Sequence, residues 1–255
     1  MTMCAAGILY SAFILFACSR EYDEGNAVYQ QIRQMMESPA PSATRASQFP
    51  KTAGKVPAEE KRDLPAASID FLSLEKINPD VVGWLAVEGA GIDYPVVQGK
   101  DNDYYLQHLF TGERNKLGSI FMDYSNHSDF SDRNTIIYGH NMQNGSMFSS
   151  LAKYKKQSYY DSFPAMVLYT PRGNYKIHLF AGIIVDGNDR SSIRLNFKDD
   201  QEFQAYIKLL KKDSTFKSNT IVDPDARIVT LCTCSYEFTN ARYALFGKLT
   251  PISIP

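Results

Sequence analysis

The chain has 255 residues, of which 44% are hydrophobic and 13% are aromatic, and its formal net charge is -1. This composition is sufficient for one well-packed domain with accessory segments. The near-neutral charge argues against the basic surface that nucleic-acid binding requires, so no nucleic-acid partner is expected.

Residues 1–19 form an apolar segment without a charged side chain. Its length is at the lower limit for a spanning helix, which needs about 17 to 25 apolar residues. We interpret it as a signal-anchor, which makes the protein a single-pass protein of the cell membrane with its remainder outside the cell. Two alternatives are a cleaved signal peptide and lipid attachment at Cys18.

The pattern of residues 20–68 predicts a helix followed by a linker. Val28, Ile32, Met35 and Met36 recur at spacings of three and four, which predicts an amphipathic helix over residues 27–37. Residues 38–67 are rich in Pro, Ala, Ser, Thr and Lys and show no apolar period. Such a composition is typical of a linker, because it cannot bury enough apolar surface to offset chain entropy.

Residues 69–255 contain the pattern of a folded domain. Short β-branched and aromatic runs separated by Gly, Pro, Asn and Asp predict strands at 82–87, 92–97, 118–122, 134–138, 165–170, 175–185, 226–232 and 242–249. Helical patterns occupy only three connections, at 102–109, 146–154 and 199–210. Because helices and strands do not alternate, we expect a mainly β fold, an eight-stranded barrel with a few connecting and N-terminal helices.

The four cysteines stand at positions 4, 18, 232 and 234. A disulfide framework would spread its cysteines through the domain, and a structural zinc site would show paired ligands at short spacing. The acidic loops at 101–103 and 123–132 are an alternative site for calcium, although acidic loops more often serve solubility. We therefore expect no metal and no cofactor.

Cys234 stands at the end of the apolar run Thr230–Cys234, and Arg242 follows eight residues later. If the two flanking strands form a hairpin, the guanidinium returns to the thiol, where it can favour a thiolate and stabilise an oxyanion. Cys232 lies on the same strand face as Cys234. It is interpreted either as a small buried hydrophobe or as a thiol that traps an oxidised nucleophile.

A cysteine nucleophile needs a base, and His140 is the best placed histidine. It follows the predicted strand at 134–138 and has Gly139 beside it. A histidine and a cysteine on two strand ends can share one proton as thiolate and imidazolium. The other histidines lie in a predicted helix, a polar loop and the middle of an apolar strand, at positions 108, 127 and 178.

These residues resemble the sortase family. Thr230-Leu-Cys-Thr-Cys234 matches the TLxTC motif, Tyr138-Gly-His140 matches the histidine segment, and Arg242 matches the downstream arginine. The longer strings Ile92–Gln98, Asp132–Met142 and Cys234–Phe238 are similar to class B sortases in particular. The resemblance covers residues 69–255, which would then be the catalytic domain.

The resemblance implies a cysteine transpeptidase on the outer face of a Gram-positive membrane. Its partners would be secreted proteins bearing a C-terminal sorting motif, and its acceptor an amine of a peptidoglycan precursor or of a pilin lysine. Cys234 would be the nucleophile, His140 the general acid and base, and Arg242 the group that orients the substrate and holds the oxyanion.

The resemblance also places three residues in substrate binding. Asn102 and Leu106 would line the groove for the sorting peptide. An equally good interpretation is that Asn102 caps a helix and Leu106 belongs to the core. The backbone N–H of Ser235, directly after Cys234, would complete the oxyanion hole. The connection at 186–213 would shape one wall of the groove.

Two other functions remain open from the residues. The domain could be a thiol peptidase that hydrolyses its substrate without transferring it, or a non-catalytic surface β-barrel in which Cys234 is simply buried.

Overall fold

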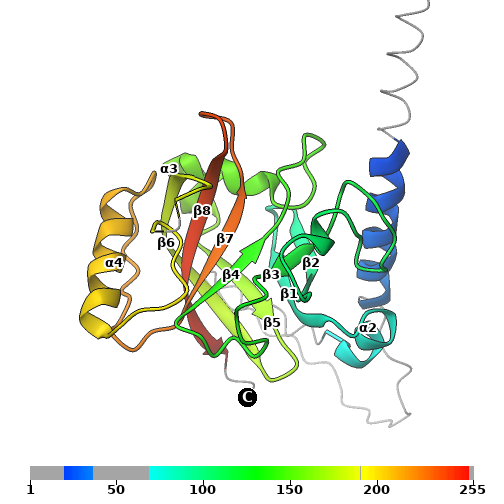
Figure 1. The fold of residues 1–255 in the computed structure, drawn as a ribbon, viewed down its shortest axis with the longest axis horizontal. Helices are drawn as coiled ribbons and strands as arrows, with labels where there is room; N and C mark the ends of the chain where they lie inside the picture. The colour runs from blue at the N-terminus through cyan, green and yellow to red at the C-terminus, as the bar shows by residue number, and fades with distance from the viewer. Residues whose placement is uncertain (1–19, 37–68, 190, 253–255) are drawn as a thin grey trace, which may run out of the picture.

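The structure, a computed structural model, describes residues 20–36, 69–189 and 191–252 (Figure 1). The predicted anchor at 1–19 and the predicted linker at 38–67 lie outside the described residues. Among the helices of the described ranges, none combines the length and apolar content needed to cross a bilayer.

Eight strands form a closed barrel, as the sequence predicts. They are β1 (Val81–Val87), β2 (Ile92–Val97), β3 (Ile120–Met122), β4 (Asn134–Tyr138), β5 (Ala165–Tyr169), β6 (Asn174–Asp186), β7 (Ile228–Cys234) and β8 (Ala241–Ile252). The order around the barrel is β1-β2-β3-β4-β7-β8-β6-β5. The β2–β3 and β4–β7 pairs are parallel, and the other pairs are antiparallel.

Strand β7 shows how alternation separates the barrel interior from its outer face. Val229 and Leu231 belong to the main core, whereas Ile228 packs in a second apolar cluster with residues of α4 (Asp200–Lys212). Because side chains alternate along a strand, Cys232 and Cys234 share the outer face with Ile228. Helix α4 lies against β6 on one side of the barrel (Figure 1).

The connections contain less α-helix than the sequence predicts. In place of a helix at 102–109 there is one 3₁₀ turn, η1 (Tyr104–Leu106). The helix predicted at 146–154 is a 3₁₀ helix, η2 (Ser149–Lys155), which is followed by α3 (Gln157–Ser162). A short helix before β1, α2 (Phe71–Ile77), is not predicted from the sequence.

A helix over residues 20–36 packs on the barrel side opposite α4 (Figure 1). Its buried side chains include Tyr29 and Ile32, while Met35 is 49% exposed. The predicted helix is therefore present, and of the four residues that predict it only Met35 does not pack against the core. The Tyr29 hydroxyl donates to the carbonyl of Gly118 over 2.7 Å, which ties the helix to the segment before β3.

Candidate active site

A cavity of about 840 Å³ opens on the outer face of β4 and β7. Its lining residues include the three candidate catalytic residues, His140, Cys234 and Arg242. Residues from the connection after β6, between Asp186 and Asn196, form part of its wall. The cavity thus extends across several connections, as a groove for an extended peptide must.

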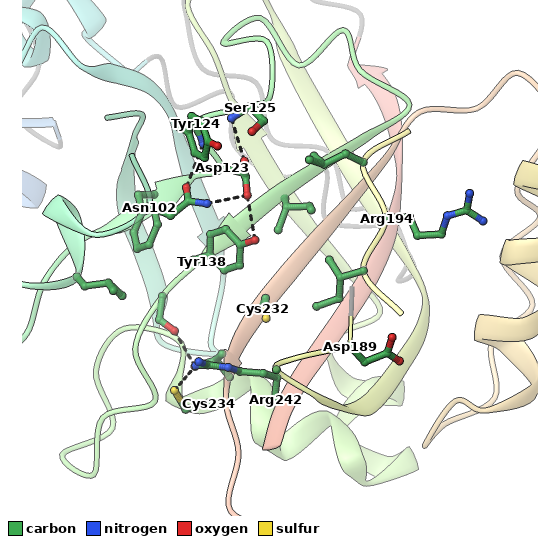
Figure 2. Close-up of a pocket in the computed structure, with 18 of the residues that line it drawn as sticks. Asn102, Asp123, Tyr124, Ser125, Tyr138, Asp189, Arg194, Cys232, Cys234 and Arg242 are labelled. Atoms are coloured by element: carbon green, nitrogen blue, oxygen red, sulfur yellow. Dashed lines mark hydrogen bonds between the residues drawn. The ribbon is translucent and has the colours of Figure 1, made fainter. Parts of the chain in front are cut away.

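Cys234 and Arg242 are paired directly across the β7–β8 ladder. The guanidinium Nη1 donates to Sγ of Cys234 over 2.6 Å (Figure 2). The hairpin register explains the contact, since Cys234 is the last residue of β7 and Arg242 is the second residue of β8. A guanidinium in this position stabilises negative charge on the sulfur and on any oxyanion that forms beside it.

His140 comes to the same end of the cavity through the parallel β4–β7 ladder. Tyr138 is in register with Cys232, so the residue two positions further along lies at the level of Cys234. Nε2 of His140 lies 2.7 Å from the carbonyl oxygen of Leu106. A carbonyl only accepts, so Nε2 carries the proton, and Nδ1 is the nitrogen that remains to exchange one.

Gly118 allows this contact between Leu106 and His140. Its φ is +61°, and a Cβ at this position would lie 2.7 Å from the Tyr105 carbonyl oxygen and 2.8 Å from that of Leu106. The same Cβ would lie 3.1 Å from Cδ2 of His140. A side chain at 118 would therefore displace the carbonyl that holds the imidazole.

Asn102 and Leu106, predicted in the peptide groove, both line the cavity. Nδ2 of Asn102 donates to the Asp123 carboxylate over 2.9 Å, and the Tyr138 hydroxyl donates to the same oxygen over 3.0 Å (Figure 2). Burial, followed by the negative charge of Asp123, raises the pKa of Tyr138 above its usual range.

Asp123 is a residue that the sequence reading did not assign to the peptide groove. It is buried and lines the cavity away from Cys234, with Asn102 and Tyr138 around it (Figure 2). Its sequence context is an acidic loop, for which calcium binding was only an alternative to a role in solubility. Among the other acidic residues of these loops, Asp101 accepts from the N–H groups of Asp103 and Tyr104, and Asp132 contacts the ring of His127.

The Ser235 backbone N–H, which the sequence predicts to complete the oxyanion hole, donates to the carbonyl of Ala241 over 2.8 Å. The hairpin closes directly after Cys234, and this closure uses the donor. The Ser235 hydroxyl donates to Glu237 and accepts from Lys155 over 2.7 Å. Ser235 thus anchors the β7–β8 connection, and Arg242 donates to the Cys234 sulfur.

Cys232 lies in the same cavity as Cys234, on the same strand face, but only 4% of its surface is exposed. Burial raises the pKa of its thiol to about 12, with the nearby Arg242 acting in the opposite direction. Cys232 therefore remains a neutral thiol at physiological pH and lines the cavity.

The sequence of the barrel is similar to that of known proteins. Residues 85–250 match the family model of the sortase domain. Sortase B of Listeria monocytogenes is 41% identical over 182 residues, which cover 71% of this chain and 74% of that protein.

Solved structures show the same similarity. The Staphylococcus aureus sortase B–substrate complex is 37% identical and has a TM-score of 0.68, with 72% of this chain and 85% of that chain covered. A sortase B complexed with triglycine is 37% identical, also with a TM-score of 0.68, and covers 72% of this chain and 86% of that chain. The chain therefore belongs to the sortase family and to its class B, and both the family and the barrel expected from the sequence are confirmed.

Proposed function

We propose that this sortase cleaves a C-terminal sorting motif after its threonine and transfers the new carboxyl end to an amine. The observation that carries the proposal is the contact of Arg242 with Cys234 at the end of the cavity that His140 also lines. Thiol, imidazole and guanidinium are the groups that an acyl transfer through a thioester needs.

In the first half of the proposed reaction, Sγ of Cys234 attacks the threonine carbonyl carbon as a thiolate. The Arg242 guanidinium stabilises the oxyanion of the tetrahedral intermediate, because it donates at the sulfur where the new bond forms. The C–N bond then breaks, the leaving amine takes a proton from the His140 imidazolium, and a thioester remains.

In the second half, the acceptor amine attacks the thioester and gives its proton to His140. The amide forms and the Cys234 thiolate leaves, so the enzyme returns to its starting state. A thioester retains acyl-transfer potential, which suits transfer to an amine better than a simple peptidase requires. The S. aureus substrate complex and the triglycine complex support a peptide substrate and an amine acceptor for this class.

The partners follow from this chemistry. Substrates would be secreted proteins with a threonine-containing C-terminal motif, bound along Asn102 and Leu106. The acceptor would be an amine of a peptidoglycan precursor or of a pilin lysine. Residues 1–19 would anchor the enzyme in the cell membrane with the barrel outside, because sortases are membrane-associated cell-wall enzymes.

The test uses the purified chain and a set of threonine-containing peptides, each with and without triglycine. One of them carries NPQTN, a motif that the resemblance to class B sortases implies. An amine-dependent ligation product, identified by mass spectrometry, supports the proposal. Cleavage alone would make the protein a thiol peptidase, and no cleavage with an unreactive thiol would make it a binding module.

Two variants test the proposed roles in the same assay. Cys234→Ala should abolish cleavage, and His140→Ala should lower kcat/KM at least about a hundredfold, the usual scale for a general acid-base. Cleavage that persists in Cys234→Ala would refute the mechanism.

The proposed anchor has its own test. The full chain should stay with membranes after alkaline extraction, and a chain lacking residues 1–19 should not. Equal release of the two chains would contradict the anchor.

A further inference from the structure

The β4–β7 ladder ends just before the two proposed catalytic residues. Its last register pair is Tyr138 with Cys232, and the backbone N–H of Gly139 donates to the Cys232 carbonyl over 3.2 Å. In a regular parallel ladder, the next donor on this strand would be the N–H of residue 141, directed at the carbonyl of residue 234.

Asn141 supplies that donor from its side chain instead. Its Nδ2 donates to the Cys234 carbonyl over 2.9 Å, between residues that are 93 positions apart in the chain. A carbonyl only accepts, which fixes the orientation of the side-chain amide. The side chain thus adds one hydrogen bond to the ladder at the level of the proposed nucleophile.

The backbone cannot make this bond because it turns away from β7 after His140. The His140 carbonyl accepts from the N–H of Phe148 over 2.9 Å, and Asn141 forms an antiparallel bridge with Met147. On the other side, the Tyr236 hydroxyl donates to the Asn141 carbonyl over 3.3 Å. Asn141 is therefore held by its own loop and by the connection that follows Cys234.

Asn141 does not belong to the described residues that line the cavity. It directly follows His140 in the chain and binds the backbone of Cys234. Its position allows it to set the separation of the two residues without contact to a substrate.

We propose that Asn141 is a positioning residue that holds the backbones of His140 and Cys234 at the separation needed for proton exchange between their side chains. This inference rests on the proposed function of these two residues. A misplacement of about 1 Å at a reacting centre can reduce a rate about a hundredfold, so one hydrogen bond at this place has a large effect on turnover.

The fold should survive the loss of this bond. The Thr233 hydroxyl still donates to the Gly139 carbonyl over 2.7 Å, and the five register pairs of β4 with β7 remain. Removal of the amide should therefore loosen the alignment at the strand ends and leave the barrel intact.

The experiment compares the full chain with Asn141→Ala and with Asn141→Asp, which keeps the volume and removes the donor. Asn144→Ala is the matched control, because Asn144 is in the same loop and its side chain accepts from Ser146, a local contact. We expect Asn141→Ala to lower kcat about tenfold, with KM for the sorting peptide changed less than about twofold and with an unchanged melting temperature.

A second readout needs no sorting peptide. The rate of Cys234 alkylation by iodoacetamide is measured across pH, with Cys234→Ala as the blank. Because proton exchange between a thiol and an imidazole depends on their separation, a changed separation should shift the pH of half-maximal alkylation by at least about 0.5 unit in Asn141→Ala. A merely structural residue would leave this profile unchanged.

The inference is overturned if Asn141→Ala behaves as Asn144→Ala in kcat and in the alkylation profile. A higher KM with an unchanged kcat would also overturn it, since that result indicates a substrate contact. If Asn141→Ala does not fold, Asn141→Asp decides by the same criteria. Failure of the proposed function is distinguishable, because then the unmodified protein forms no ligation product while the alkylation profiles still test Asn141.

Discussion

Arg242 and Cys234 are direct register partners across the β7–β8 hairpin, and Nη1 of the guanidinium lies 2.6 Å from Sγ. The contact comes from two paired strands and not from a loop. The strand pairing therefore fixes the distance between the Arg242 guanidinium and the sulfur. The same guanidinium can donate a hydrogen bond to an oxyanion on the attacked carbonyl.

Two replacements of Arg242 should distinguish the effect of its positive charge on catalysis from the effect of its planar shape. We expect Arg242→Ala to lower kcat/KM for the sorting peptide at least about a hundredfold, because an oxyanion donor is lost. Arg242→Lys keeps the charge but not the planar fork, and it should lose at least about tenfold. Arg172→Ala is the control, since Arg172 is exposed and pairs with Asp129. Wild-type activity in Arg242→Lys would show that charge alone is sufficient.

The two cysteines of β7 should differ sharply in reactivity. Burial raises the pKa of Cys232 to about 12, so the thiol stays protonated, and thus unreactive, as pH rises from neutral until it approaches that value. Iodoacetamide at neutral pH should therefore label Cys234 and leave Cys232 free, which peptide mass mapping of the native protein shows directly. Equal labelling of both thiols would contradict the buried position of Cys232.

Gly118→Ala should impair catalysis through the Leu106 carbonyl. A Cβ at 118 would lie 2.8 Å from this oxygen and 3.1 Å from the His140 ring, so the carbonyl that holds Nε2 must move. We expect a fall in kcat of at least about tenfold, since the imidazole loses its orientation. Gly112→Ala is a matched control, because Gly112 also has a positive φ, +91°, but nothing lies within 4 Å of the added Cβ. Equal kcat values for the two variants would exclude this role of Gly118.

The strands were predictable because their apolar and β-branched runs are local patterns. The predicted run at 134–138 coincides with β4, and the run at 226–232 differs from β7 by two residues at each end. The helix predicted at 102–109 was wrong, because Asp101 caps a turn at Asp103 and Tyr104, and Tyr105 is held by long-range bonds. Tyr105 and Leu109 of this segment are buried in the barrel core, whereas Tyr104 is exposed.

The candidate site was only partly predictable, because only some of its contacts join residues that are close in the sequence. Cys234 and Arg242 are eight residues apart, so a hairpin is enough to bring them together. Asp123, Gly118 and Asn141 acquire their roles through contacts with residues distant in the chain. Neither the register of the parallel β4–β7 pair nor the path of the loop after His140 can be read from a single sequence.

Glu237 should make the β7–β8 connection sensitive to acid. Its partial desolvation would raise its pKa, but the hydrogen bonds from Lys155 and Ser235 outweigh this effect and lower the pKa to about 2. A lowered pKa in the folded state means that the stabilisation is complete above the unfolded value of about 4.3 and is lost as pH falls toward about 2.

Denaturant unfolding of the wild type and of Glu237→Gln at several pH values tests this expectation. The two proteins should differ in unfolding free energy at neutral pH and converge in the acid range. Glu75→Gln is the control, because Glu75 is an exposed residue of α2, and it is expected to show no such convergence. A difference between wild type and Glu237→Gln that is independent of pH would contradict the ion pair as its cause.

The helix at 20–36 should contribute to the stability of the barrel in part through the Tyr29 hydroxyl. Tyr29 is 1% exposed, its hydroxyl donates to the Gly118 carbonyl, and it accepts from the N–H of Phe110 over 3.3 Å. Tyr29→Phe leaves both backbone groups buried without this partner, which costs about 1 to 3 kcal/mol of unfolding free energy. Met35→Ala, on the exposed side of the same helix, should change it by less than about 0.5 kcal/mol. Equal unfolding free energies for the two variants would show that the helix is not held through Tyr29, and an unchanged denaturant slope in Tyr29→Phe confirms that stability alone has changed.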